Sequence, residues 1–211
     1  MYLPKANAVE SGPDVLELLR RAGAGHVVSF VDGTFDATLM PFLVDNELRV
    51  VRGHVARANP QWRTLDGRSV LMVVPVTDAY VSPAWYPSKR EDPKVVPTWN
   101  YEVVHVHATA VVHDDPVWVE QLVRDLTAAR EAVRIERADG AETWSVDDAP
   151  GDFIARQLRA IIGIELLVAS IDAKRKLSQN RSDADRAGVS AALARSNHDG
   201  DRAVARSMLA E

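Results

Sequence analysis

The sequence contains no cysteine, and this absence removes two kinds of structure from consideration. Disulfide bonds cannot form, and no thiolate is present to bind a metal ion. A chain without cysteine fits a reducing compartment. Residues 1–14 lack the apolar segment of a signal peptide, and the longest apolar runs are too short to cross a bilayer. We therefore expect a cytoplasmic protein that does not associate with membranes.

Positive charge is also scarce, because 25 lysine and arginine residues stand against 30 aspartate and glutamate residues, a formal net charge of -5. An acidic chain exerts no long-range attraction on nucleic acid, so any contact with DNA needs a local basic patch. The basic triplet Lys174-Arg175-Lys176 is a candidate, but aspartates follow it closely. We interpret the triplet as the solvated start of a helix and keep nucleic acid as an open partner.

Familiar catalytic motifs are missing from the sequence as well. We find no serine or cysteine nucleophile motif, no glycine-rich phosphate loop and no H-E-x-x-H. His105 and His107 share one face of a predicted strand, as metal ligands can, but no obvious carboxylate partner accompanies them. We expect no metal site and leave the catalytic residues, if any, unassigned.

Short apolar segments separated by turn residues dominate the first two thirds of the chain. Asp32-Gly33 between two such segments is a strong hairpin signal. The pattern predicts strands over 26–31, 35–44, 48–53, 69–75, 79–82, 98–113 and 163–171. A six- or seven-stranded, mainly antiparallel sheet of this kind buries one face and loses its exposed edges by closing into a barrel.

The remaining segments predict peripheral helices and connections. Amphipathic periodicity predicts helices over 11–23, 116–134 and 151–160. Other segments predict a short helix broken by Pro60 at 55–65, a loop at 83–97 and a polar connection at 137–144. The polar segment 173–211 predicts two helices broken at 197–200. We therefore expect a mainly β barrel domain over 1–172 and a helical extension over 173–211.

The segment Gly53–Trp62 holds a glycine, a histidine, an arginine, an asparagine and a proline within ten residues. Arg57 and Asn59 follow a predicted strand at the point where a helix would begin. Free backbone amides at a helix start, together with a guanidinium group, form an anion site. The alternative is a surface turn with a solvated arginine. His54 is a candidate for chemistry or for axial ligation, or else a histidine bonded to backbone.

A second unusual stretch begins at Tyr80 and ends at Tyr101. It carries hydroxyls, amides, a cation and large aromatic rings at Tyr80, Ser82, Trp85, Tyr86, Lys89, Thr98, Trp99, Asn100 and Tyr101. The rings could be ordinary core, but a core strand needs neither Thr nor Asn beside them. A flat, anionic, heteroaromatic cofactor would use such rings for stacking and such polar groups for its edges and phosphate. We therefore predict a binding site here.

These motifs resemble those of the FMN-binding negative transcriptional regulator family, the PaiB-like proteins. The resemblance extends in order over essentially the whole chain, through Met1–Pro4, Gly53–Pro60, Tyr80–Tyr86, Val96–Tyr101, Trp144–Pro150 and Lys176–Arg181. It implies an antiparallel FMN-binding split β-barrel, so that 1–172 would be the cofactor-binding domain. It also implies a homodimer with flavin sites at the subunit interface and a role as a negative transcriptional regulator, directly or through a partner.

The same resemblance assigns provisional roles to residues. Arg57 becomes the candidate for the flavin phosphate, with His54 and Asn59 near it, and Thr38 lies on the strand beside the isoalloxazine. One wall of the site would come from Tyr80, Ser82, Trp85, Tyr86 and Lys89, and another from Thr98, Trp99, Asn100 and Tyr101. Lys176 and Gln179 would reach over from the C-terminal region.

The chain departs from the family pattern at Leu39, where many relatives have histidine, and at His107-Ala108, where relatives often have Tyr-Gly. These departures leave two alternatives open. One is a split-barrel oxidoreductase that uses FMN. The other is a haem-dependent biosynthetic enzyme of the piperazate synthase type, which shares a Gly-His-x-x-Arg-Ala-Asn-Pro segment and would make His54 an iron ligand. The intact Trp85-Tyr86-x-x-Lys89 stretch favours the regulator-like branch.

Overall fold

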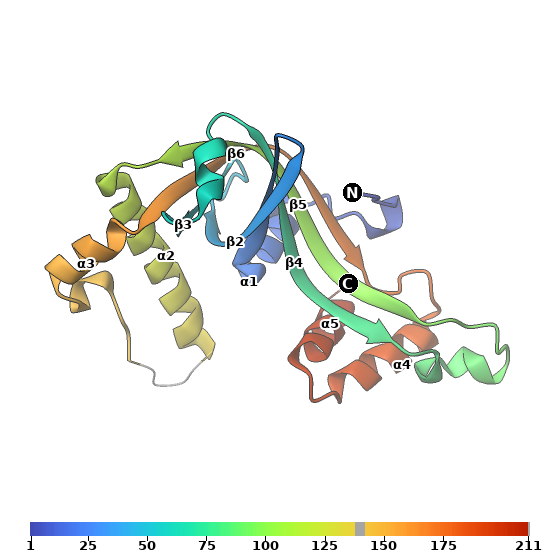
Figure 1. Ribbon diagram of the computed structural model, residues 1–211. Coiled ribbons are helices and arrows are strands. Elements are labelled where there is room, and N and C mark those ends of the chain that lie inside the picture. The colour runs from blue at the N-terminus through green and yellow to red at the C-terminus, as the bar shows by residue number, and fades with distance from the viewer. Residues whose placement is uncertain (138–141, 211) are drawn as a thin grey trace. The chain divides into compact units, whose positions relative to one another are not determined.

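The computed structural model describes residues 1–137 and 142–210. Six strands are hydrogen-bonded in the closed order β1-β2-β3-β6-β5-β4, which confirms the predicted antiparallel barrel with peripheral helices. The strands, traced in Figure 1, are β1 (Ala24–Val31), β2 (Thr34–Val44), β3 (Val50–Ala56), β4 (Ser69–Val81), β5 (Thr98–His113) and β6 (Ile161–Lys176).

The helices of the described residues fall close to the predicted ranges. They are α1 (Gly12–Ala22), α2 (Pro116–Arg137), α3 (Gly151–Leu158), α4 (Asp183–Ala194) and α5 (Asp199–Leu209). Short 3-10 turns accompany them as η1 (Lys5–Asn7), η2 (Pro60–Thr64), η3 (Pro83–Trp85), η4 (Pro87–Arg90) and η5 (Val146–Asp148). The predicted pair of helices in the C-terminal segment is confirmed as α4 and α5.

The chain divides into two compact units. Unit 1 comprises Met1–Ala22, Val74–His105 and Ile171–Glu211, and unit 2 comprises Gly23–Val73 and Val106–Ser170. Strands β4, β5 and β6 contribute residues to both units. The division predicted after residue 172 stays a prediction, although β6 continues through that point to Lys176.

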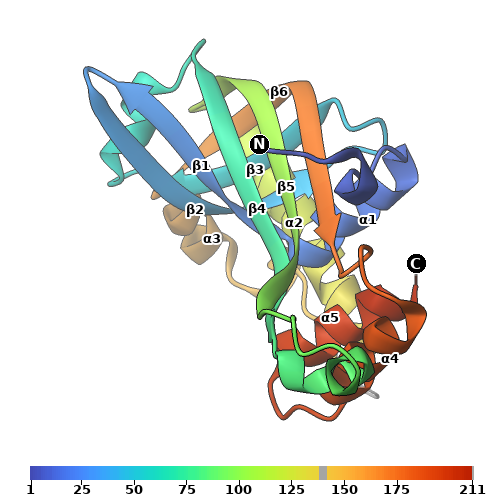
Figure 2. The ribbon, with the colours of Figure 1, turned by 90° about the vertical axis from the view of Figure 1, so that its right-hand side faces the viewer.

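A tight hairpin joins β1 to β2 in unit 2 (Figure 2). The register pairs Val31 with Thr34, which leaves Asp32 and Gly33 as the two loop residues. Both have positive φ, 50° and 80°, as a type I′ turn requires. Aspartate tolerates this conformation and glycine adopts it without steric cost. The predicted hairpin signal is confirmed.

Alternation of side chains builds the core of unit 2. The side chains of Val106, Ala108 and Ala110 on β5 are buried, while the residues between them are half-buried. Large buried residues of the neighbouring strands complete this core, namely Val27, Met40, Phe42, Val51, Met72, Ile162, Ile164 and Leu166. The α2 helix adds Val119, Leu122 and Leu126.

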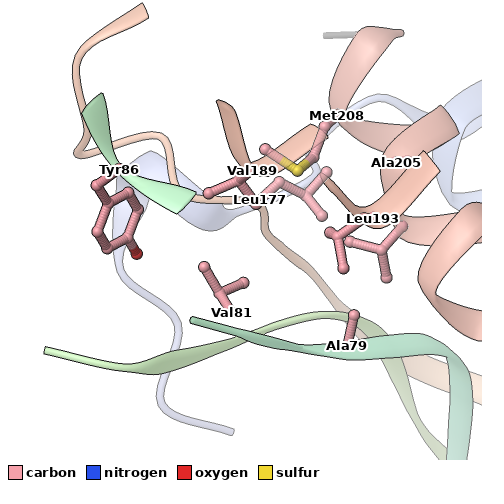
Figure 3. Close-up of a cluster of buried hydrophobic side chains, with 9 residues drawn as sticks. Ala79, Val81, Tyr86, Leu177, Val189, Leu193, Ala205 and Met208 are labelled. Carbon is pink, nitrogen blue, oxygen red and sulfur yellow. The ribbon is translucent and has the colours of Figure 1, made fainter. Parts of the chain in front are cut away.

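Unit 1 has a separate buried cluster, shown in Figure 3. Ala79 and Val81 at the end of β4 face α4 and α5, which supply Val189, Leu193 and Met208 among others. Tyr86 belongs to the same cluster and is only 2% exposed. The two C-terminal helices are therefore part of a hydrophobic core that includes the loop after β4.

Two predicted boundaries in the first half are wrong. Residues 55–65 are not a broken helix, because β3 runs on to Ala56 and only the short η2 turn follows. The segments 69–75 and 79–82 are one strand, β4, which continues through the exposed Pro75. In β4 the buried residues have even numbers up to Val74 and odd numbers from Ala79. Such a change of face is typical of a bulge, and a strand can accept proline there.

Two further segments differ in detail from the prediction. The last strand begins at Ile161 and ends at Lys176, rather than spanning 163–171. The loop predicted at 83–97 contains the turns η3 and η4. The polar connection predicted at 137–144 lies partly outside the described residues.

Candidate functional site

The predicted site residues fall into two groups, one in each unit. Unit 2 holds Thr38, His54, Arg57 and Asn59. Unit 1 holds Tyr80, Ser82, Trp85, Tyr86, Lys89, Thr98, Trp99, Asn100, Tyr101, Lys176 and Gln179. Within each group some residues contact one another and others are buried in the core, so each group is described by its own contacts.

Asn59 connects the start of η2 to strand β2. Its Nδ2 donates to Thr38 Oγ1 at 2.7 Å, and its Oδ1 accepts from the backbone N–H of Gln61 at 2.9 Å. Asparagine at the residue before a helical turn satisfies a backbone donor that would otherwise lack a partner. The fold therefore places an amide and a hydroxyl together, and both residues are half-buried.

The glycine before His54 allows close packing between β3 and β2. A Cβ at Gly53 would overlap the carbonyl oxygen of Pro41 and the side chain of Met40. On the other face of β3, His54 is half-buried and its Nδ1 is fully buried without a hydrogen-bond partner. Burial lowers the pKa of His54 below its ordinary value of 6.5. The imidazole is therefore neutral at pH 7 and keeps one unused polar atom.

Arg57 follows β3 and is held by several groups of unit 2. Its Nε donates to the carbonyl oxygen of Arg159 at 2.7 Å, and an Nη makes a longer contact of 3.4 Å with that of Ile161. Its two terminal nitrogens both bond the Asp114 carboxylate, one of them at 2.8 Å. The side-chain hydrogen bond raises the pKa of Arg57 and lowers that of Asp114.

A cavity of about 260 Å³ lies beside this ion pair. Arg57 and Asp114 line it together with the first turn of α2, the end of α3 and the start of β6. Its apolar wall comes from Pro116, Val119, Ala155, Leu158 and Ile161, and its remaining charged residues are Asp115, Glu120 and Arg159. The cavity gives a small charged group room to approach Arg57.

Lys176 contacts several of the predicted site residues of unit 1. Its Nζ donates to Thr98 Oγ1 at 2.6 Å and to the Trp99 carbonyl oxygen at 2.5 Å. The ammonium also lies 5.9 Å from the centre of the Tyr101 ring. Burial lowers the pKa of Lys176 from its ordinary value. Thr98, Trp99 and Tyr101 thus all contact Lys176, which lies 75 to 78 positions later in the chain.

Two aromatic rings of unit 1 stand exposed, and one belongs to Trp99, whose carbonyl oxygen accepts from Lys176. Trp99 is 53% exposed and Tyr80 is 46% exposed. Their ring centres are 6.0 Å apart, with an interplanar angle of 72°, which is an edge-to-face arrangement. Large aromatic side chains bury most of their surface in ordinary cores, so an exposed pair is a surface available for stacking.

Other predicted residues of unit 1 lie in its interior. Asn100 is fully buried and accepts a hydrogen bond from Ser178 at 2.9 Å. Tyr86 and Trp85 pack into the cluster with α4 and α5, and the Arg181 guanidinium lies 4.6 Å from the Tyr86 ring centre. These residues shape the loop from within, and direct contact with a cofactor stays a prediction for them.

The last three residues of the group are on or near the surface. Ser82 accepts from the Ala84 N–H at 3.2 Å and so begins η3. Lys89 is exposed on η4. Gln179 is occupied by local backbone, because it accepts from the Leu177 N–H and donates to the Arg175 carbonyl oxygen, at 2.8 and 2.9 Å.

Sequence reasoning missed two carboxylates that contact predicted segments. Asp114 and Asp115 directly precede α2, but only Asp115 caps that helix, accepting from the Val117 N–H at 3.1 Å, while Asp114 binds Arg57. Sequence reasoning also missed Asp185, which is 3% exposed and accepts from the backbone N–H and hydroxyl of Ser88. A pair of adjacent aspartates was the only signal for Asp114, and none pointed to Asp185.

The described residues contain neither a metal-ligand cluster nor a helix that could span a membrane. In that part of the chain, no three or more His, Asp or Glu side chains come close enough together to hold a metal ion. No helix within residues 1–137 and 142–210 has the length and apolar character that crossing a bilayer demands.

The closed six-stranded antiparallel sheet with peripheral helices is that of the split β-barrels. Flavocytochrome Anf3 from Azotobacter vinelandii has a similar structure, with a TM-score of 0.59 and 16% identity over 85% of this chain and 74% of that chain. The FAD and heme binding protein from Mycobacterium smegmatis is also similar, with a TM-score of 0.57 and 17% identity. The match covers 86% of this chain and 79% of that chain. At such identities the likeness establishes the fold alone.

The family follows from the sequence itself. Residues 1–170 match the family described as "Putative FMN-binding domain", and the chain belongs to that family. A relative in Bacillus subtilis, named protease synthase and sporulation protein PAI 2, is 32% identical over 188 residues. The match covers 88% of this chain and 85% of that protein. The PaiB-like resemblance noted in the motifs is therefore confirmed.

Proposed function

We propose that this protein binds FMN and acts as a negative regulator of transcription, directly or through a partner. The observation that carries the cofactor proposal is the Lys176 ammonium group, which donates to Thr98 and to the backbone of Trp99, a residue whose exposed ring meets that of Tyr80. A cation next to exposed aromatic surface suits a ligand that is both flat and anionic. Membership of a family described by FMN binding supports the same ligand.

The donor set of unit 1 fits the ring system of a flavin. Trp99 and Tyr80 offer ring faces and edges, and the Thr98 hydroxyl offers a polar contact. One of the three protons of the Lys176 ammonium is left for a ligand, because Thr98 and Trp99 take the other two. When bound, FMN would supply reversible electron transfer, while these residues would bind and orient its ring.

The donor set of unit 2, taken by itself, fits the phosphate group of a flavin nucleotide. Arg57 carries a guanidinium group whose planar edge matches phosphate oxygens. Thr38 and Asn59 hold a hydroxyl and an amide against each other. The buried, unpartnered Nδ1 of His54 adds a polar atom that a ligand or water could satisfy. We propose that this group binds the phosphate and its neighbouring hydroxyls.

A second copy of the chain is the partner we propose for the outer face of the β1–β2 hairpin (Figure 2). Phe30 and Phe35 pair across the turn with ring centres 4.6 Å apart, and both are more than half exposed. Leu39, also 58% exposed, lies further along the same face. Such an apolar strip on a sheet face favours association. We propose a homodimer with the flavin at its interface.

The regulatory role rests on the family resemblance of the motifs. The net charge of -5 weakens non-specific attraction to DNA, so action through a protein partner is the simpler route. Genome-wide DNA selection with the FMN-loaded protein distinguishes the routes. Enrichment of one defined sequence supports direct binding, and no enrichment above a beads-only control rules it out.

The cofactor site is tested by FMN titration of two variants and a control. Lys176→Met should weaken FMN binding by about tenfold, since a charge-assisted hydrogen bond is lost. Trp99→Ala should weaken it by about three- to tenfold through lost stacking. Phe153→Ala removes a 42% exposed ring from α3, outside the proposed site, and should change nothing. Equal FMN affinity in all three variants and the parent would reject the site.

Haem is a second candidate ligand because of His54. Its imidazole is neutral and has an unpartnered nitrogen, which suits an axial ligand. Two proteins of similar fold bear names that refer to a flavocytochrome and to haem binding. A Soret band that appears on haem addition and is lost in His54→Ala would favour this candidate. Unchanged free-haem absorption would exclude it.

A further inference from the structure

The guanidinium group of Arg57 is fixed in two different ways. Backbone carbonyl oxygens of Arg159 and Ile161 accept from Nε and one Nη. These contacts come from the polypeptide itself and persist whatever side chains do. The remaining edge, formed by the two terminal nitrogens, bonds the carboxylate of Asp114. The backbone contacts therefore fix the orientation of the Arg57 guanidinium group. Its anion-binding edge is occupied by the side chain of Asp114.

Asp114 is a replaceable occupant of that edge. Its side chain is 55% exposed, and among the described residues its carboxylate bonds Arg57 alone. An exposed ion pair of this kind contributes little to stability. A phosphate group has the same bidentate geometry toward arginine as a carboxylate and carries more charge. An arriving phosphate could therefore take the place of Asp114 without moving Arg57.

The cavity beside the pair gives access for this exchange. It has a volume of about 260 Å³ and is lined by both Arg57 and Asp114. Its other carboxylates are engaged elsewhere, since Asp115 accepts from the start of α2 and Glu120 binds Arg124. Among the described lining residues, Asp114 is thus the carboxylate that directly opposes an anion at Arg57.

We infer that Asp114 is an internal competitor that occupies the anion-binding edge of Arg57 until the phosphate of the ligand displaces it. This inference rests on the proposed binding of FMN and adds a determinant of its affinity. Asp114 sets how tightly a phosphorylated flavin binds, while leaving the binding of the flavin ring unchanged. Removing its charge frees the guanidinium edge and also removes repulsion toward the incoming phosphate.

The test compares Asp114→Asn with Asp115→Asn. Both changes remove one negative charge from the same cavity wall, and asparagine caps a helix as well as aspartate, so the control keeps the start of α2. FMN, riboflavin and inorganic phosphate are titrated into each protein. We expect Asp114→Asn to bind FMN and phosphate about three- to tenfold more tightly than Asp115→Asn. Riboflavin, which has no phosphate, should bind both equally.

The outcomes separate this inference from the proposed function. If the parent binds FMN but Asp114→Asn binds it no more tightly than Asp115→Asn does, Asp114 is not a competitor. The proposal that the protein binds FMN would still stand. If no protein binds FMN, the proposed function fails and the inference fails with it. A final arm repeats the comparison with Arg57→Gln in both proteins. The gain must then vanish, and a gain that persists would show a general charge effect and overturn the inference.

Discussion

The amide of Asn59 and the hydroxyl of Thr38 form a hydrogen bond of 2.7 Å between the segment after β3 and strand β2. The same amide group uses its oxygen to begin the η2 turn. One asparagine thus fixes the turn that follows the Gly-His-x-x-Arg segment and also holds a hydroxyl of the neighbouring strand. The hydroxyl and amide of the proposed phosphate-binding group in unit 2 are therefore held in place before any ligand arrives.

Thr38→Val should destabilise the protein by about 1 kcal/mol, because the Asn59 amide loses its acceptor while the shape of the side chain is kept. Urea unfolding monitored by tryptophan fluorescence measures the change. Thr38→Ser keeps the hydroxyl and is the matched control. If valine and serine give the same free energy of unfolding, the hydrogen bond contributes nothing to stability.

Tyr86→Phe should stabilise the protein by about 1 kcal/mol. The Tyr86 hydroxyl is buried in the cluster of unit 1 and has no hydrogen-bond partner, so its removal eliminates a desolvation penalty while the ring keeps its contacts. Thermal and urea unfolding both report the effect. A loss of stability instead would mean that this hydroxyl makes a favourable bond in solution.

Gly188→Ala should destabilise the protein by about 1–3 kcal/mol, since overpacking at a rigid contact forces backbone shifts. A Cβ at this position of α4 would overlap the carbonyl oxygen of Trp85. Gly151→Ala is the control, because nothing lies within 4 Å of a Cβ there and alanine favours a helix. Equal unfolding free energies for the two variants would argue against the close approach of α4 to the Trp85 loop.

His54 should make the protein less stable as the pH falls from about 7 to 5. Burial lowers its pKa in the folded state, so the unfolded chain binds more protons in this range and stability declines as the pH decreases through it. His54→Asn should flatten the profile of unfolding free energy against pH. His26→Asn, which removes an exposed imidazole from the same unit, is the matched control. Parallel slopes for the parent and His54→Asn would contradict the assignment.

Local signals in the sequence were sufficient where the fold depends on neighbouring residues. Asp32-Gly33 predicted the hairpin because the turn conformation is decided by those two residues. The boundary at Pro60 was harder, since proline predicted a broken helix while pairing with β6 extended β3 to Ala56. Tertiary pairing overrode local preference there. Pro75 misled in the same way, because an irregular strand accommodates it.

The candidate site required contacts that no local pattern encodes. Lys176 was assigned to the site only through the family resemblance, and its bond to Thr98 joins residues far apart in the chain. Arg57 was identified as a cation, but its carboxylate partner lies in the segment after β5. Tyr86 looks like a binding residue in sequence, whereas its burial depends on helices α4 and α5. The sequence identified the kinds of side chain in the site, whereas only the fold shows which residues those side chains contact.

We propose that the chain binds FMN, and an absorption titration of the purified protein with FMN measures this binding. Riboflavin and haem are titrated in parallel. We expect the flavin absorption bands to shift on binding and the shift to saturate at one FMN per chain. The bound FMN should stay with the protein through gel filtration. The chain does not bind FMN if FMN separates completely from the protein during gel filtration at concentrations that saturate other flavoproteins.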